Sequence, residues 1–218
     1  MEWEVVLVVA AVFVAVVGIG FYLSRKSWQS IRSNYKRLAE SYRLELTQPK
    51  AKGFGLFQAS PYLFGEWNGR KMSIQTVSAG LKDSRQAETA VHLQTALRED
   101  CVLVIRSKRG LNRLERAEFK KLVRIKGPHE KFDRRLSIAS NRPDWVSEKI
   151  SASMCERILE DLGDTSGTLL LVKGRLTYRE TGLLSGGAAI KRMERMIAML
   201  LWFAEAMEDG EKDDRSAD

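Results

Sequence analysis

The clearest pattern along the chain is an uncharged apolar run near its N-terminus. Residues 5–23 read VVLVVAAVFVAVVGIGFYL, nineteen residues without a charge. A helix of about 20 apolar residues is long enough to cross the hydrocarbon core of a bilayer. The pattern therefore predicts a transmembrane helix over 5–23, preceded by a short external tail over 1–4.

The residues beside this run favour an uncleaved anchor over a secretory signal peptide. A signal peptide needs a basic start and a small-residue cleavage site, but no Lys or Arg precedes the run and no such site follows it. Lys and Arg close to a span tend to stay cytoplasmic, and six of them follow within the next 20 residues: Arg25, Lys26, Arg32, Lys36, Arg37 and Arg43. We therefore expect the inner membrane as location, with the N-terminus outside and the rest of the chain in the cytoplasm.

A helical pattern continues beyond the apolar run, over 24–43. Trp28, Ile31, Tyr35, Leu38 and Tyr42 recur at spacings of three and four, with charged residues between them. This period predicts an amphipathic juxtamembrane helix. We expect its aromatic stripe to lie on the following domain or in the headgroup region.

Strand patterns dominate the next hundred residues. Runs at 62–67 and 71–77 flank Asn68-Gly69, a dipeptide that suits tight hairpin turns because both positions take positive φ. Alternation over 91–97 and a β-branched run at 102–105 predict a second hairpin. The other elements expected in this part are strands at 44–46, 122–126 and 135–139 and a helix at 111–121.

The remaining pattern is mainly helical. Apolar positions predict a helical region from 143 to 162 and a final helix from 188, capped by Ser185 or Gly186, with a third hairpin around Lys173-Gly174. Sequential hairpins with grouped helices indicate an α+β domain, in which helices pack on one face of an antiparallel sheet. We expect this cytoplasmic domain over 44–207 and a disordered acidic tail over 208–218.

Basic residues concentrate in one segment of the domain. From 106 to 135 there are twelve Lys and Arg against four Asp and Glu. A solvated surface explains most such runs, but anionic headgroups attract each nearby Lys or Arg by about 1 kcal/mol. The residues selected as contacts for anionic lipid or an acidic protein partner are Arg106, Lys108, Arg109, Arg113, Arg116, Lys120 and Lys121. Aromatic residues that stack on bases are scarce there, which argues against nucleic acid.

No motif indicates catalysis, a cofactor or a metal ion. Cys101 and Cys155 suit apolar core positions and a reducing cytosol, and His92 and His129 have no partner ligands at metal spacing. The segment 164–168 departs from the aspartic-protease order and suits a turn, and no phosphate-binding loop motif is present. We therefore assign no catalytic, cofactor or metal residue, and a tethered enzyme with a dispersed site stays an alternative.

The predicted span carries small residues on one face, at Ala11, Ala15 and Gly18. Small residues at this spacing let helices approach closely. A homodimer is therefore one hypothesis.

Three short segments give the chain a resemblance to known proteins. They are LAESYRLEL at 38–46, GEWNGR at 65–70 and KFDRRLSIAS at 131–140. With the anchor, they resemble small single-pass bacterial membrane proteins that carry a cytoplasmic domain of unknown function, which implies a bacterial inner-membrane setting. The leading hypothesis is a non-enzymatic adaptor or scaffold. A membrane-linked nucleic-acid binder is a further alternative.

Overall fold

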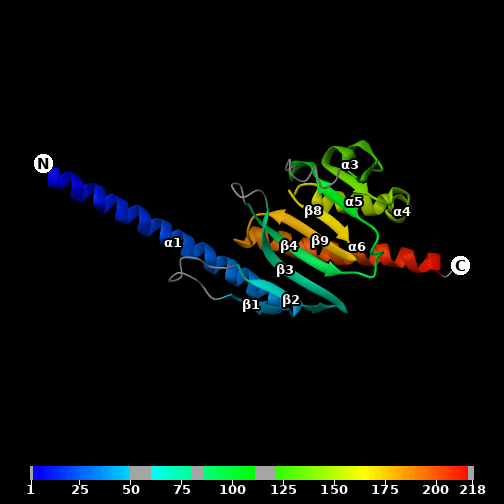
Figure 1. The fold of residues 1–218 in the computed structure, drawn as a ribbon, viewed down its shortest axis with the longest axis horizontal. Helices are drawn as coiled ribbons and strands as arrows, with labels where there is room; N and C mark the ends of the chain where they lie inside the picture. The colour runs from blue at the N-terminus through cyan, green and yellow to red at the C-terminus, as the bar shows by residue number, and fades with distance from the viewer. Residues whose placement is uncertain (1, 50–59, 80–85, 111–120, 216–218) are drawn as a thin grey trace.

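The fold joins one long N-terminal helix to an α+β domain, shown by a computed structural model (Figure 1). The structure describes residues 2–49, 60–79, 86–110 and 121–215. Within them, an antiparallel sheet has helices packed on one face. The fold class expected from the sequence is therefore confirmed.

Helix α1 (Glu2–Tyr42) runs without a break through both of the helical patterns seen in the sequence. Every side chain that is described between 6 and 23 is exposed, and this segment is long and apolar enough to cross a membrane. Farther along the same helix, Ile31, Tyr35 and Leu38 are 0–1% exposed and belong to the domain core. The aromatic stripe therefore packs on the domain, the first of the two environments considered for it.

The described residues form a nine-stranded antiparallel sheet with the order β1-β2-β3-β4-β9-β8-β5-β7-β6. The strands are β1 (Glu45–Thr47), β2 (Tyr62–Trp67), β3 (Arg70–Ala79), β4 (Gln86–Gln94), β5 (Leu103–Ser107), β6 (Val123–Ile125), β7 (Leu136–Ser140), β8 (Thr168–Val172) and β9 (Arg175–Thr181). The last two strands along the chain thus lie in the middle of the sheet, between β4 and β5.

Two of the three predicted hairpins are present. β2 pairs with β3, and β8 pairs with β9. At both turns the two central residues have positive φ, 51° and 73° at Asn68 and Gly69, and 52° and 65° at Lys173 and Gly174. This conformation matches the twist of the flanking strands.

The predicted hairpin between 91–97 and 102–105 is wrong. β4 pairs with β3 and β9, whereas β5 pairs with β7 and β8. The backbone N–H and hydroxyl of Thr95 both donate to the Gly174 carbonyl oxygen, at 2.8 and 2.9 Å, where β4 ends. Alternation identifies a half-buried strand but not its neighbours, and β9 and β8 fill the space between β4 and β5.

The described residues contain more helices than the sequence pattern predicts between residues 108 and 162. The region 143–162 divides into α4 (Pro143–Lys149) and α5 (Ala152–Leu162), because the Ser151 hydroxyl accepts a hydrogen bond from the Met154 amide and starts a new helix. Two short helices were not expected, α3 (Glu130–Arg135) and the 3₁₀ helix η1 (Lys108–Gly110). The helix expected at 111–121 lies almost wholly outside the described residues.

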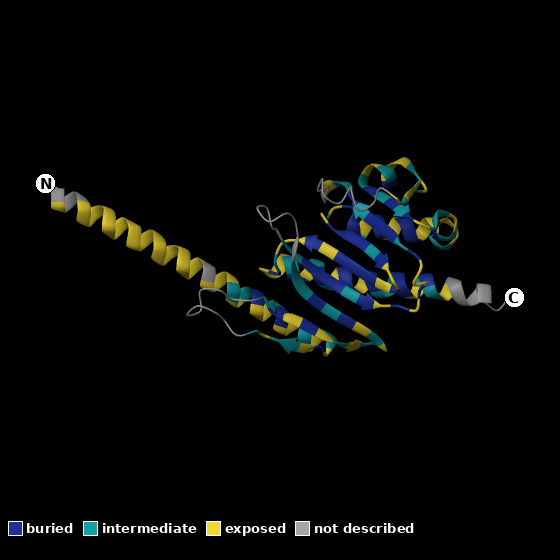
Figure 2. Cartoon of the chain, in the orientation of Figure 1, coloured by how far each residue is buried: buried dark blue, intermediate teal, exposed yellow. Residues whose placement is uncertain are grey.

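Helix α6 (Gly187–Arg215) crosses behind the sheet in Figure 1 and buries Met193, Ile197 and Leu200. Buried side chains from α1, α5, α6 and the sheet form one continuous core. Figure 2 shows α1 exposed where it projects and buried where it joins the domain.

Packing in the structure extends beyond residues 44 and 207, the expected limits of the domain. The domain core begins within α1, at Ile31. At the other end α6 continues to Arg215, and the Glu208 carboxylate binds the Arg70 guanidinium with only 11% of its side chain exposed. Glu208, the first residue of the expected acidic tail, therefore has a charged partner on the sheet.

Candidate functional site

One end of the sheet lies beside the apolar half of α1. The Asn34 side chain donates to the carbonyl oxygens of Leu184 and Gly186, at 2.8 and 3.2 Å, and the Gly186 amide donates to the Ser30 hydroxyl at 3.1 Å. At 1.5 Å per helical residue, Ser30 is about 10 Å beyond the apolar run. We call this end, where β9 leads into α6, the proximal edge.

The proximal edge gathers basic residues from separate segments. β5 runs parallel to β9, since β8 lies antiparallel between them, so η1 follows β5 at the same edge. Arg109 and Arg135 both contact the Asp164 carboxylate, with nitrogen–oxygen distances of 3.2 and 3.4 Å. Two guanidinium groups on one exposed carboxylate give this cluster of three residues a net positive charge.

The sequence-selected basic residues have different surroundings. Arg109 is at the proximal edge, the Lys108 ammonium donates to the Asp133 carbonyl oxygen, and Lys121 is exposed. Arg106 is partly buried on β5. Arg113, Arg116 and Lys120 lie outside the described residues.

The basic residues of the juxtamembrane helix also differ in their surroundings. Arg25, Lys26 and Arg32 are exposed, whereas Arg37 pairs with Glu194 of α6 at 3.1 Å. Lys36 is exposed and pairs with Glu40 at 3.7 Å. Within the span, the small residues Ala11, Ala15 and Gly18 are exposed.

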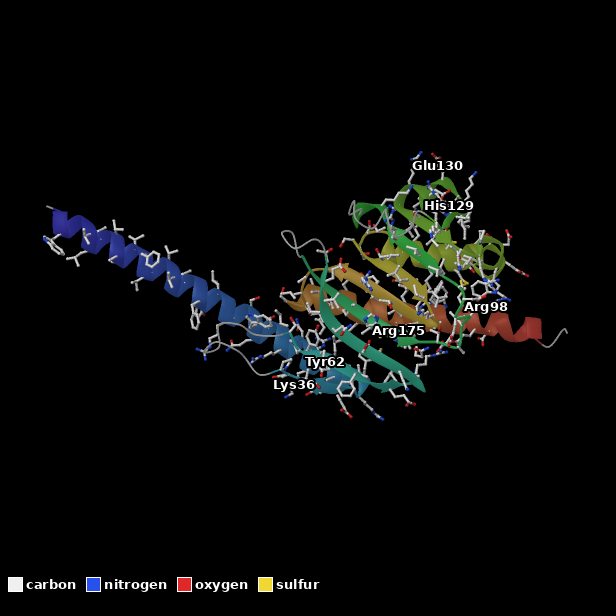
Figure 3. All side chains as sticks on the ribbon, in the orientation of Figure 1. Lys36, Tyr62, Arg98, His129, Glu130 and Arg175 are labelled. Carbon is white, nitrogen blue, oxygen red and sulfur yellow. The ribbon has the colours of Figure 1, made fainter. Side chains whose placement is uncertain are left out.

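A second surface lies on the face of β2, β3, β4 and β9 that is turned away from α1 and α6. We call it the open face. The register aligns Ser73, His92 and Thr177 across neighbouring strands, and strand alternation places Arg175 and Arg179 on the same side as Thr177. Figure 3 labels Arg175 and Tyr62 on strands of this face.

A row of hydrogen bonds crosses the open face at His92. Its Nε2 lies 3.0 Å from the Gln75 amide nitrogen, and its Nδ1 lies 2.9 Å from the Thr177 hydroxyl. Burial lowers the pKa of His92 from its usual 6.5, and the charges of Arg179 and Arg175 lower it further. A neutral ring that accepts from Gln75 and donates to Thr177 satisfies both contacts.

This lowered pKa predicts a pH dependence of stability. The unfolded chain takes up a proton near pH 6.5 and the folded chain only at lower pH, so the stability from a neutral His92 is complete above pH 6.5 and falls as pH decreases through the folded-state pKa. In His92→Gln, the free energy of unfolding should fall less between about pH 7 and pH 5 than in the unchanged chain. Urea unfolding at several pH values measures this, and an identical decline in both proteins would contradict it.

A cavity of about 580 Å³ opens on this face. Its lining includes Phe64, Glu66, Lys71, Ser73, His92 and Arg175. Its volume lies within the range that holds small ligands or side chains of a partner. Two basic groups against one carboxylate give it a net positive charge.

Other potential chemistry is limited in the described residues. They contain no group of three or more His, Cys, Asp or Glu able to hold a metal ion. Burial raises the pKa of the Cys101 thiol and raises that of Cys155 to about 11, so both remain protonated at neutral pH. A protonated buried thiol is a poor nucleophile.

Sequence reasoning missed four basic residues that the fold brings into these surfaces, Lys71, Arg135, Arg175 and Arg179. The alternation of Arg175, Thr177 and Arg179 along a predicted strand was a usable signal, because alternate residues share a face. Nothing local indicated that Arg135 would meet Arg109 and Asp164.

Comparison with known proteins gives one informative similarity. No protein-family model matches the chain, and no curated protein matches its sequence. Among solved structures, the chain resembles the mycobacterial trehalose monomycolate transport factor A, TtfA, with a TM-score of 0.55, 12% identity, and coverage of 84% of this chain and 95% of that one. At this identity the similarity shows a shared fold.

Proposed function

We propose that this chain is a single-pass, cytoplasm-facing adaptor of the bacterial inner membrane, without enzymatic activity, whose proximal edge contacts anionic headgroups. The continuity of α1 carries this proposal. One unbroken helix has exposed apolar side chains over 6–23 and then contributes Ile31 and Tyr35 to the domain core. The anchor and the domain are therefore joined rigidly.

A rigid junction holds the proximal edge near the bilayer. Charges attract a membrane surface only within about a Debye length, roughly 10 Å at moderate salt. Arg25 and Lys26 lie two and three residues after the end of the apolar run, and Arg109 and Arg135 lie at the proximal edge. The positive charge thus lies on the side of the domain where anionic lipid would attract it.

The name of the similar protein agrees with an accessory role. TtfA is called a transport factor for trehalose monomycolate. We extend to this chain only the idea of a factor that supports a membrane process, together with the bacterial setting. Its substrate and partners are not carried over.

Vesicle binding tests the lipid contact. A fragment of residues 26–218 should bind vesicles of phosphatidylglycerol and phosphatidylcholine more tightly than vesicles of phosphatidylcholine alone. Reversing both charges in Arg109→Glu with Arg135→Glu should weaken binding to the anionic vesicles about 10-fold or more at low salt, since each nearby cation contributes up to about 1 kcal/mol. Co-sedimentation gives both affinities.

A charge-matched control uses the opposite end of the sheet. Lys71→Glu with Lys173→Glu makes the same change in net charge near the start of β3 and at the β8–β9 turn. Binding of this variant should change less than about 2-fold. Equal binding of the unchanged fragment to anionic and neutral vesicles, or equal losses in the two variants, would contradict the lipid contact.

A further inference from the structure

The open face carries more cations than carboxylates: the register places Lys71, Arg175 and Arg179 on it, against Glu66 and Glu88. Lys71, Arg175 and Arg179 are exposed, and among the described residues none of them has an ion-pair partner. By contrast, Arg37, Arg70 and Arg109 each contact a carboxylate. The hydrogen-bonded row of Gln75, His92 and Thr177 lies between these cations. Because all three side chains are neutral, the row does not compensate the positive charge.

An aromatic side chain, Phe64, lines the cavity of the open face, and a second ring, Tyr62, lies against it. Tyr62 and Phe64 are 39% and 41% exposed, and their ring centroids are 6.0 Å apart. Exposed aromatic residues beside arginine are typical of protein interfaces, where they act as anchors. The open face therefore offers an apolar contact and a positive charge within reach of one ligand.

The orientation of the open face separates it from the bilayer. In Figure 1, α1 runs within the plane of the view while the sheet is seen face-on, so the open face points sideways relative to the helix axis. If α1 crosses a membrane, the open face would be roughly perpendicular to the membrane surface and would not point toward it. A neighbouring protein can reach a face with this orientation more readily than lipid headgroups can.

We propose that the open face binds an acidic segment of a second protein, whose carboxylates pair with Arg175, Arg179 and Lys71 and whose apolar side chain packs on Phe64. This inference rests on the proposed membrane placement for its orientation. It adds a protein contact on a surface separate from the proximal edge. The positive charge of the face favours an acidic segment by charge complementarity. The exposed rings of Tyr62 and Phe64 favour a segment that also carries an apolar residue.

Peptide binding to the full chain tests the proposal. The chain is placed in nanodiscs of neutral lipid, and the probe is a peptide of about 12 residues that alternates Glu with Ser around one Phe. Fluorescence anisotropy should show saturable binding, and a peptide with Lys in place of Glu should not bind. Arg175→Glu with Arg179→Glu should weaken the acidic peptide about 10-fold or more, whereas Lys191→Glu with Arg195→Glu on α6 should change it less than about 2-fold.

Photocrosslinking identifies the occupant in cells. A photoreactive phenylalanine analogue in place of Phe64 should crosslink to a segment rich in Asp and Glu in another protein, mapped by mass spectrometry, and the crosslink should disappear in Arg175→Glu with Arg179→Glu. A crosslink to a second copy of this chain would overturn the proposal.

The remaining outcomes are also decisive. Equal binding of the acidic and basic peptides, or no saturable binding below about 1 mM, would overturn the docking site even if anionic vesicles still bind the proximal edge. Loss of anionic-vesicle binding in Arg175→Glu with Arg179→Glu would assign the open face to lipid and overturn it as well. Failure of the vesicle experiment alone would instead remove the proposed lipid contact.

Discussion

A fragment that starts at residue 44 should be unfolded, whereas a fragment that starts at residue 26 should fold cooperatively. The shorter fragment has the limits that the sequence pattern suggested for the domain, but it lacks Ile31, Tyr35 and Leu38, which are 0–1% exposed. Truncation of a single buried large side chain costs about 2–5 kcal/mol. Losing three should exceed about 6 kcal/mol, comparable to the whole stability of a typical domain.

Circular dichroism and urea unfolding of the two fragments measure this difference. Within the fragment of residues 26–218, Tyr35→Ala should lower the free energy of unfolding by about 3 kcal/mol, because it also removes the hydrogen bond to the Thr76 hydroxyl. The neighbouring Lys36→Ala should change it by less than about 0.5 kcal/mol, since that side chain is 72% exposed. A cooperative transition for the fragment of residues 44–218, at similar stability, would show that α1 is only a tether.

Arg70→Met should lower the free energy of unfolding by about 2–3 kcal/mol. The Arg70 guanidinium donates to both oxygens of Glu208, at 2.6 and 2.5 Å, and the Ala96 amide donates to Glu208 at 2.8 Å. The two side chains are only 18% and 11% exposed. Removing the guanidinium leaves a largely buried carboxylate without its charged partner, which is costly in a region of low dielectric constant.

A double-mutant cycle separates this pairing from packing. Arg70→Met with Glu208→Met should be more stable than Arg70→Met alone, because the buried charge is then absent. The control is Arg134→Met, whose pair with Glu130 is more than 70% exposed and should contribute less than about 0.5 kcal/mol. Additive effects of the two substitutions in urea unfolding would mean that Arg70 and Glu208 are not coupled.

The sequence pattern predicted the turns correctly, because a turn conformation depends on the few residues that form it. Asn68-Gly69 and Lys173-Gly174 formed the expected turns because positive φ at both positions depends on the residues themselves. The second expected hairpin was wrong because strand pairing depends on distant segments, and β9 and β8, from the C-terminal part of the chain, lie between β4 and β5. The same applies to Glu208, whose partner Arg70 is 138 residues away in the sequence.

The proximal edge and the open face were likewise only partly predictable from the sequence. A net positive segment was visible from composition, but its pairing with Asp164 was not. Arg109, Arg135 and Asp164 come from three segments that the sheet and its connections bring together. The open face could be anticipated only in part, because alternation indicates which strand residues share a side but not which side helices will cover.

Three properties of this protein follow directly from its residues: an apolar helix long enough for a bilayer, an α+β domain and an excess of positive charge. Each depends on composition or on a short period along the chain. Three others depend on the folded arrangement: α1 enters the domain core, β9 and β8 occupy the middle of the sheet, and Arg175 and Arg179 are exposed without ion-pair partners among the described residues. These features depend on contacts between residues far apart in sequence, which no local pattern encodes.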